Sequence, residues 1–329
     1  MQHNDLSYSI ILTNQCGLDC SHCFLKGSRG VDTTMPLSTV KAVSDKIVGM
    51  GANATINWGG GEPLILGSEK WSRIVDYECF SNPLIENSLY STLMVTLDAD
   101  WKQILDRFDT FIFSIDSYRL KNERYNLAQA TGNLAVLRGK KSVSYTPSID
   151  DTERDVAQYY AMAQDLGADV FHIGFLYDEN LLPEDVYLRM LDEVTRRHAL
   201  YGGPDIGFFS KCQKSGDPYR AVGWRAYDCF SKMYYIYGNE VTSCYILKSL
   251  GYDVPRTDID TFLKSEDMGW LNKEFIGEFF FGQLSGKCKD CEYQSLCMGG
   301  CPYFTARSKE KKDVYCNVYK RIFKELLAL

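Results

Sequence analysis

A strand-like pattern runs directly into a cysteine-rich loop near the amino end of the chain, in the sequence Tyr8-Ser9-Ile10-Ile11-Leu12-Thr13-Asn14-Gln15-Cys16-Gly17-Leu18-Asp19-Cys20-Ser21-His22-Cys23. The three cysteines have the spacing Cys-x3-Cys-x2-Cys. Three thiolates on one tight loop can hold three irons of a [4Fe–4S] cluster, which leaves the fourth iron without a nearby protein ligand. An open position on a metal is typical of a site that binds a substrate or cofactor. Zinc binding and three unrelated buried cysteines are the alternatives.

The composition makes these cysteines unusual. The chain has 329 residues, enough to bury a large core without disulfides, yet it carries 12 cysteines. Its net charge of −7 disfavours a nucleic-acid partner. The amino end lacks a signal-peptide pattern and no run is apolar enough to span a bilayer, so we expect a cytoplasmic protein with no membrane partner. In that reducing compartment, clustered cysteines more often bind metal than form disulfides.

Between residues 30 and 205, short β-rich runs alternate with helical patterns. Helices are predicted over Pro36–Met50, with Ser38 as the N-cap, and over Asp150–Leu166. This alternation predicts parallel βαβ units in an open sheet or a partial barrel, with ligands at the carboxyl ends of the strands. The six candidate strands are Tyr8–Thr13, Ala54–Trp58, Ser91–Leu97, Thr110–Ile115, Lys141–Thr146 and Val170–Leu176.

The alternation stops after residue 204. The remainder has short β-like runs over Met233–Tyr237 and Val241–Ile246, many loops and a final helix over Tyr315–Leu329. We therefore divide the chain into a first domain over residues 1–208 and a second over residues 209–329.

A glycine-rich turn, Trp58-Gly59-Gly60-Gly61-Glu62-Pro63, ends the second candidate strand. Glycines let a backbone approach a ligand and adopt positive φ. With the cysteine triad, this turn resembles the radical SAM superfamily, in which Gly-Gly-Glu-Pro follows the second strand. An aromatic residue or histidine, here His22, precedes the last cysteine in that family. The resemblance implies that the open iron binds S-adenosylmethionine, and that one electron releases a 5′-deoxyadenosyl radical that abstracts a substrate hydrogen atom.

The same resemblance assigns roles to residues near the cofactor. It implies that Glu62 accepts hydrogen bonds from the ammonium group of S-adenosylmethionine, beside Gly60 and Gly61. Phe111–Ser117 resembles the family's fourth strand, which places Ser114 near the cofactor. By the same alignment Arg124 pairs with the cofactor carboxylate, a group that suits a guanidinium fork, or it is a solvated helix charge.

Two acidic residues are candidates for catalysis. The family resemblance places Asp116 near cofactor and substrate at the end of the fourth strand. Asp98 ends the sequence Thr96-Leu97-Asp98, where many relatives have Thr-Asn-Gly after the third strand. It either takes the polar role of that motif or indicates that the substrate-binding end of the barrel differs in this protein. Other candidates to line the substrate pocket are Tyr118, Thr146, His172 and Tyr177. His172 lies inside an apolar strand and is either a pocket residue or a satisfied core histidine.

Seven cysteines in the last third of the chain resemble the SPASM extension of radical SAM enzymes, in which seven cysteines bind two further [4Fe–4S] clusters. Gly238 departs from that pattern by one residue. The resemblance implies three clusters in all. One auxiliary cluster takes Cys229, Cys244 and Cys301, and the other takes Cys288, Cys291, Cys297 and Cys316. A zinc ribbon is the alternative for the quartet that begins at Cys288.

Two cysteines lie outside both patterns. Cys212 is in the linker between the domains. It is either the fourth ligand of the first auxiliary cluster, a hydrogen-atom donor to a substrate radical as in radical epimerases of the superfamily, or a bystander. Cys79 is expected to be a small buried hydrophobe.

These patterns predict an α/β fold: a partial (β/α)6 TIM-like barrel with a carboxyl-terminal cysteine-rich iron–sulfur extension. SPASM enzymes mostly modify ribosomally made peptides or mature anaerobic sulfatases, so we expect crosslinking or epimerisation of a peptide. A small-molecule enzyme acting on a sugar or antibiotic precursor, or a sulfatase-maturing enzyme, is the alternative, and an iron–sulfur electron carrier is the non-enzymatic one. The expected partners are a peptide or small-molecule substrate and a reductant such as flavodoxin or ferredoxin. The leader of a peptide substrate is bound either by a separate leader-binding protein or by the barrel surface.

Overall fold

The part of the chain that the structure describes contains ten strands, which form one curved sheet in the order β10-β9-β8-β1-β2-β3-β4-β5-β6-β7. The computed structural model describes residues 6–18, 20–23, 25, 32–176, 181–207, 232–249, 251–266, 271, 286–297, 299–307 and 313–328. Within them the strands are β1 (Leu6–Thr13), β2 (Ala54–Gly60), β3 (Ile85–Tyr90), β4 (Thr110–Ser114), β5 (Lys140–Tyr145), β6 (Val170–Ile173), β7 (Asp205–Ile206), β8 (Met233–Tyr237), β9 (Glu240–Thr242) and β10 (Arg256–Asp258). Neighbours from β8 through β1 to β7 run parallel, and only β9 and β10 are antiparallel to their neighbours.

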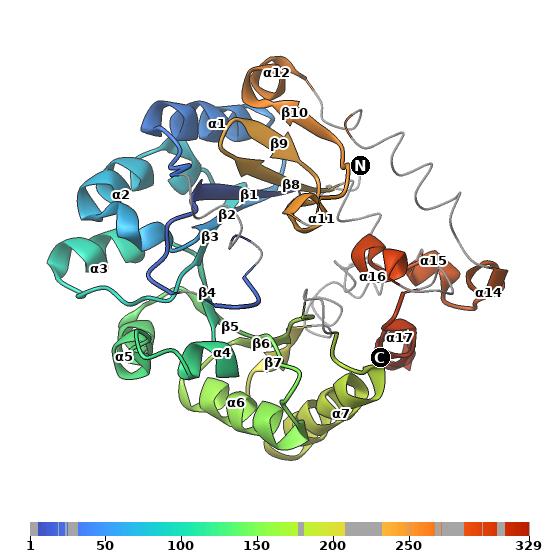
Figure 1. Ribbon diagram of the computed structural model, residues 1–329. Coiled ribbons are helices and arrows are strands. Elements are labelled where there is room, and N and C mark those ends of the chain that lie inside the picture. The colour runs from blue at the N-terminus through green and yellow to red at the C-terminus, as the bar shows by residue number, and fades with distance from the viewer. Residues whose placement is uncertain are drawn as a thin grey trace.

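Helices follow the first six strands and cover one face of the sheet, as Figure 1 shows for α1–α3 and α5–α7. Their bounds are α1 (Leu37–Gly49), η2 (Pro63–Leu66), α2 (Ser68–Val75), η3 (Glu78–Phe80), α3 (Ala99–Leu105), α4 (Ser117–Leu120), α5 (Leu127–Val136), α6 (Glu153–Asp165) and α7 (Glu184–Tyr201). The later helices are α11 (Tyr245–Ser249), α12 (Ile259–Lys264), α14 (Gly286–Lys289), α15 (Gln294–Cys297), α16 (Pro302–Ala306) and α17 (Cys316–Ala328). The fold is therefore the predicted α/β class, a partial (β/α)6 barrel followed by a cysteine-rich segment.

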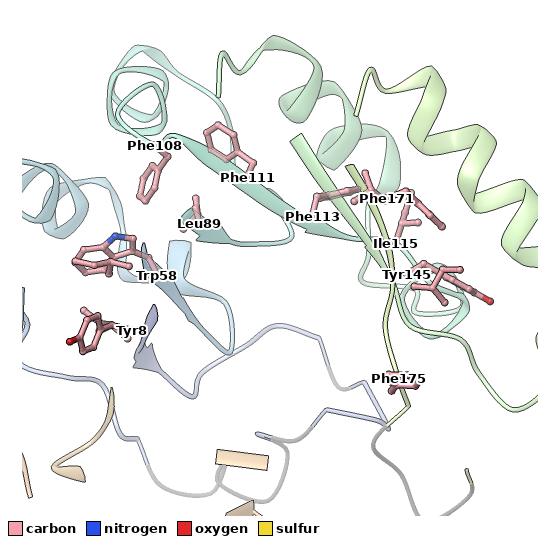
Figure 2. Close-up of a cluster of buried hydrophobic side chains, with 14 of the residues drawn as sticks. Tyr8, Trp58, Leu89, Phe108, Phe111, Phe113, Ile115, Tyr145, Phe171 and Phe175 are labelled. Carbon is pink, nitrogen blue, oxygen red and sulfur yellow. The ribbon is translucent and has the colours of Figure 1, made fainter. Parts of the chain in front are cut away.

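Alternation along each strand gives the barrel its two faces. In β4, Phe111 and Phe113 are fully buried while Ile112 and Ser114 are only half-buried. The buried side chains point to the helices and form the core drawn in Figure 2, with Tyr8 of β1 and Trp58 of β2. Because side chains alternate in direction along a strand, the half-buried set faces the inside of the barrel.

The predicted third strand is wrong. The strand is Ile85–Tyr90 rather than Ser91–Leu97, and its sequence Ile-Glu-Asn-Ser-Leu-Tyr reads as polar. Asn87 can be buried in it because its amide is satisfied on both sides. The Trp58 Nε1 group donates to Asn87 Oδ1 at 2.9 Å, and Asn87 Nδ2 donates to the Cys79 carbonyl at 2.9 Å.

Smaller differences concern the ends of elements. Ser38 lies inside α1, whose N-cap is Pro36 without a side-chain hydrogen bond, so α1 begins two residues earlier than an N-cap at Ser38 requires. The predicted strand Val241–Ile246 divides into β9 and α11. A seventh parallel strand, β7, pairs with β6 in addition to the six that were predicted.

The carboxyl-terminal third is joined to the barrel at two places. Strand β8 pairs in parallel with β1, so the sheet continues across the boundary predicted at residues 208 and 209, which stays a prediction. Helix α17 packs on α7, where Arg321 forms an ion pair with Asp192 at 3.1 Å. No helix in the described part of the chain combines the length and apolar character that a membrane crossing requires.

Candidate active site at the carboxyl edge of the barrel

The cysteine loop leaves β1 where β2 makes its closest approach. Gly61 N donates to the Thr13 carbonyl and Glu62 N donates to the Gln15 carbonyl, each at 2.8 Å. A Cβ on Gly60 would lie 2.2 Å from the Thr13 oxygen, and one on Gly61 would lie 2.3 Å from the Gln15 oxygen. Gly60 also has φ of +139°, so glycine is required there twice over. The glycine-rich turn thus fixes the backbone immediately before Cys16.

Glu62 joins the ends of β2 and β3. Its Oε1 accepts from Leu64 N at 3.0 Å and from Ser91 Oγ at 2.8 Å. Its Oε2 accepts from Thr92 N at 2.9 Å and from Thr92 Oγ1 at 2.6 Å. Ser91 and Thr92, rather than Asp98, therefore occupy the position directly after the third strand.

The cysteines of the triad lie on one short loop, in which Cys23 N donates to the Cys20 carbonyl at 3.2 Å. Burial raises the pKa of Cys20, the charge of Arg119 opposes this, and both Cys16 and Cys23 contribute further to the increase. No three His, Cys, Asp or Glu side chains of the described residues converge as ligands of a single metal ion. A cubane cluster does not require such convergence, because each thiolate binds a different iron. The donor set and the grouping of the thiols fit a [4Fe–4S] cluster at Cys16, Cys20 and Cys23.

The segment after β4 packs against the triad loop. The ring of Tyr118 lies on His22, with centroids 4.2 Å apart. Arg124 Nη1 donates to the Gly17 carbonyl at 3.4 Å. The predicted cofactor residues His22 and Arg124 thus meet at this loop, although they are far apart in sequence.

Asp116 is fully buried and caps the short helix α4. Its Oδ1 accepts from Arg119 N at 2.9 Å, and its Oδ2 forms an ion pair with Arg119 Nη1. Both carboxylate oxygens are thereby occupied by the protein itself. The sequence placed Asp116 correctly after the fourth strand but did not indicate its ion pair with Arg119. An acidic and a basic residue three positions apart also occur as an ordinary solvent-exposed pair on a helix.

A polar row crosses the inner face of the barrel at the same level. Ser114 of β4 pairs in register with Ser144 of β5, which pairs with His172 of β6. All three are half-buried, unlike their fully buried neighbours on the other face. Gly207 leaves room for the imidazole, since a Cβ there would lie 1.9 Å from His172 Nδ1. Ser114 and His172 were predicted, whereas Ser144 was recognised only through the strand register.

Other predicted pocket residues lie elsewhere. Asp98 is exposed and caps α3 by accepting from Trp101 N at 2.9 Å, so the prediction that it directly follows the third strand is wrong. The cause is the misplaced third strand, because β3 ends at Tyr90, eight residues before Asp98. Thr146 lies at the end of β5, where its Oγ1 would be 3.2 Å from a Cβ on Gly174. Tyr177 lies outside the described residues.

The carboxyl-terminal cysteines form a second group. The pKa of Cys297 is raised to about 12, mainly by burial and to a smaller extent by Asp313, Cys316 and Cys288. The assignment of these cysteines to one auxiliary cluster stays a prediction. Cys291 is half-buried and its N–H donates to the Cys288 carbonyl at 3.3 Å.

Asp313 organises the turn that carries Cys301. Its Oδ2 accepts from Cys301 N at 2.6 Å and its Oδ1 accepts from Tyr315 N at 2.8 Å. A Cβ on Gly300 would lie 2.4 Å from Asp313 Oδ2, so the turn needs glycine there. Burial raises the pKa of Asp313 to about 7. Sequence reasoning missed this residue, because a single aspartate in a charged loop carries no motif.

The remaining cysteines differ in what the structure describes. Burial raises the pKa of Cys244 to about 11. Cys79 is fully buried and burial raises its pKa to about 12, which confirms the prediction of a small buried hydrophobe. Cys212 and Cys229 lie outside the described residues, so their predicted roles stay predictions.

Solved structures share this architecture over nearly the whole chain. One, described as native anSMEcpe with bound AdoMet and Kp18Cys peptide, superposes with a TM-score of 0.77 at 19% identity and covers 98% of each chain. A histidine-tagged form of anSMEcpe with bound AdoMet gives a TM-score of 0.75 at 19% identity, covering 98% of this chain and 94% of that one. SuiB from Streptococcus suis bound to precursor peptide SuiA gives 0.66 at 13% identity, covering 94% of this chain and 74% of that one.

These neighbours are radical SAM enzymes, and the protein has their fold, as the sequence motifs predicted. No family model matches the sequence, and no curated protein matches it.

Proposed function

We propose that the protein is a radical SAM enzyme of the SPASM type that modifies a ribosomally made peptide. The observation that carries this proposal is the rigid junction of the Gly60–Gly61 turn with the loop of Cys16, Cys20 and Cys23 at the carboxyl edge of a parallel barrel. That edge is where α/β barrels carry out their chemistry.

In this proposal each part of the edge has a task. Cys16, Cys20 and Cys23 hold a [4Fe–4S] cluster, and His22 packs beside it on Tyr118. When bound, the cluster and S-adenosylmethionine supply a 5′-deoxyadenosyl radical after one-electron reduction by a flavodoxin or ferredoxin. Ser114 and Arg124 orient the cofactor from the end of β4 and the segment behind it.

Glu62 has a structural task and a proposed binding task. Its oxygens already hold Leu64, Ser91 and Thr92, so it fixes the ends of β2 and β3 before any cofactor binds. A carboxylate offers about four lone-pair directions, and four donors occupy them here. Binding of the cofactor's ammonium group by Glu62 would therefore displace one of these donors, most simply the Ser91 hydroxyl.

The proposed substrate is a peptide. Two structural neighbours were solved with peptides, Kp18Cys on anSMEcpe and SuiA on SuiB. The inner row of Ser114, Ser144 and His172 offers hydrogen-bonding groups that suit a peptide backbone. The two auxiliary clusters at the carboxyl-terminal cysteines, with Cys212 as ligand or hydrogen donor, belong to the same proposal.

The first experiment tests the class of enzyme. Anaerobic reconstitution with iron and sulfide, followed by dithionite and S-adenosylmethionine, is expected to give 5′-deoxyadenosine and methionine. The C16A/C20A/C23A variant is expected to lose this product, while the matched control C79A keeps it, because Cys79 is buried away from the loop. Cluster absorbance without 5′-deoxyadenosine would favour an electron carrier, and a colourless zinc-containing protein would overturn the proposal.

The second experiment tests the substrate and the outcome. Candidate peptides encoded beside the gene are incubated in D₂O and analysed by mass spectrometry. A gain of one deuterium at a Cα that is lost in C212A indicates epimerisation. A loss of two hydrogens indicates a crosslink. Turnover of a sugar or antibiotic precursor with no change in any peptide would refute the peptide assignment.

A further inference from the structure

A buried charge lies beneath the triad loop and has no place in the proposed chemistry. Arg119 is on α4, with 19% of its side chain exposed, and its Nη1 pairs with the fully buried Asp116. Its Nε is buried and has no hydrogen-bond acceptor among the described residues. A buried guanidinium group left partly unsatisfied is costly, so a missing acceptor is expected nearby.

The position of Arg119 follows from two contacts of its own segment. The Tyr118 ring contacts the His22 ring in a tilted arrangement and Arg124 donates to the Gly17 carbonyl, so residues on both sides of Arg119 touch the triad loop. Between them, the charge of Arg119 acts on Cys20, where it opposes the increase in pKa that burial causes. Cys20 is the buried thiol of the triad.

Tyr125 brings a second donor to the same place. It is only 9% exposed, and its hydroxyl has no hydrogen-bond partner among the residues that the structure describes. Burial raises its pKa; Arg119 opposes this, while Asp116, Glu62 and Cys20 contribute to the increase. One guanidinium N–H and one hydroxyl thus lie buried and unpaired on the segment that contacts the triad loop.

We propose that Arg119 is a positioning residue for the amino-terminal cluster: pinned by Asp116, its guanidinium group faces the Cys20 sulfur and stabilises the reduced cluster, with the Tyr125 hydroxyl as a second donor. This inference rests on the proposed function, since it requires a cluster at the triad. Reduction adds negative charge to the cluster, so a fixed positive charge and hydrogen bonds to sulfur raise its reduction potential. Asp116 then serves to hold Arg119, because both of its oxygens are engaged by that residue.

The test is a redox titration of the reconstituted full-length protein. Electron paramagnetic resonance follows the signal that changes when S-adenosylmethionine is added, which isolates the amino-terminal cluster from the others. The Arg119→Gln variant is expected to assemble the cluster, but with a midpoint potential at least about 59 mV more negative. This shift corresponds to a tenfold lower equilibrium constant for one-electron reduction. Lys121→Gln removes an exposed charge from the end of the same helix and is expected to leave the potential unchanged.

A second variant covers the case in which Arg119→Gln does not fold because Asp116 is left unpaired. Tyr125→Phe removes only the hydroxyl and leaves the ion pair intact. It is expected to raise the melting temperature of the cluster-free protein, because an unpaired buried hydroxyl is removed, but not that of the reconstituted protein. An equal shift in both forms would overturn the role of Tyr125.

The possible failures can be told apart. Absence of iron at the triad of the wild-type protein refutes the proposed function itself. Equal potentials for Arg119→Gln and Lys121→Gln refute the role of Arg119. An unchanged potential with a tenfold weaker affinity for S-adenosylmethionine would also overturn it, since Arg119 would then serve the cofactor instead of the cluster.

Discussion

The substitution Gly61→Ala tests how steric crowding, as distinct from backbone conformation, affects stability at the junction of β2 with the triad loop. The new Cβ would lie 2.3 Å from the Gln15 oxygen, whereas ordinary contacts begin at 3.4 Å, so the strands must part by about 1.1 Å. That movement also stretches the 2.8 Å bond from Glu62 N to the Gln15 carbonyl. Overpacking costs about 1–3 kcal/mol and the lost hydrogen bond about 1 kcal/mol, so we expect a decrease of about 2–4 kcal/mol in the free energy of unfolding.

Two other glycines provide matched controls. Gly51 has φ of +63° but open space around a Cβ, so Gly51→Ala tests conformation alone and is expected to cost about 1 kcal/mol. Gly132 is exposed inside α5 with no neighbour within 4 Å, so Gly132→Ala is expected to stabilise the protein by about 0.5–1 kcal/mol.

The assay is urea unfolding of the cluster-free protein under reducing, anaerobic conditions, followed by circular dichroism. Iron uptake on reconstitution provides a second measurement, because the displaced Gln15 directly precedes Cys16. Gly61→Ala is expected to bind less iron than either control. If Gly61→Ala were no less stable than Gly51→Ala, the close approach of β2 to the loop would be disproved as the feature that fixes the triad.

Three further predictions concern buried groups. Glu62→Ala is expected to lower the free energy of unfolding by about 2–4 kcal/mol, because buried Thr92 loses both hydrogen bonds that it donates to Glu62 Oε2, whereas exposed Glu69→Ala leaves it unchanged in the same urea assay. Asp313, with its pKa raised by burial to about 7, keeps its proton in the folded chain while the unfolded chain releases it near pH 4. Stability therefore falls as pH rises from about 4 to 7, and Asp313→Asn removes that slope in urea titrations across this range; an unaltered slope counts against this account. Cys79, with its pKa raised by burial to about 12, is expected to resist iodoacetamide at pH 8 until the protein unfolds, and labelling of native protein at Cys79 in peptide maps contradicts this.

Much of the fold was predictable because its signals are local. The spacing of Cys16, Cys20 and Cys23, the turn at Gly60–Gly61 and the strand-to-helix alternation depend only on neighbours in sequence. Strand β3 was not predictable in this way. Its polar residues are buried because Trp58 and the Cys79 carbonyl satisfy Asn87, and both partners come from other elements.

The sequence alone indicated the proposed class of chemistry, since motif spacing identifies the thiols and the glycines that a cluster site needs. Only the tertiary structure decided what surrounds them. It moved Asp98 to an exposed helix cap, occupied Asp116 with Arg119, and placed that pair on the segment whose Tyr118 and Arg124 contact the triad loop. The physical reason is that the environment of a buried charge depends on contacts between segments distant in sequence, which leave no periodic or spaced pattern in the chain.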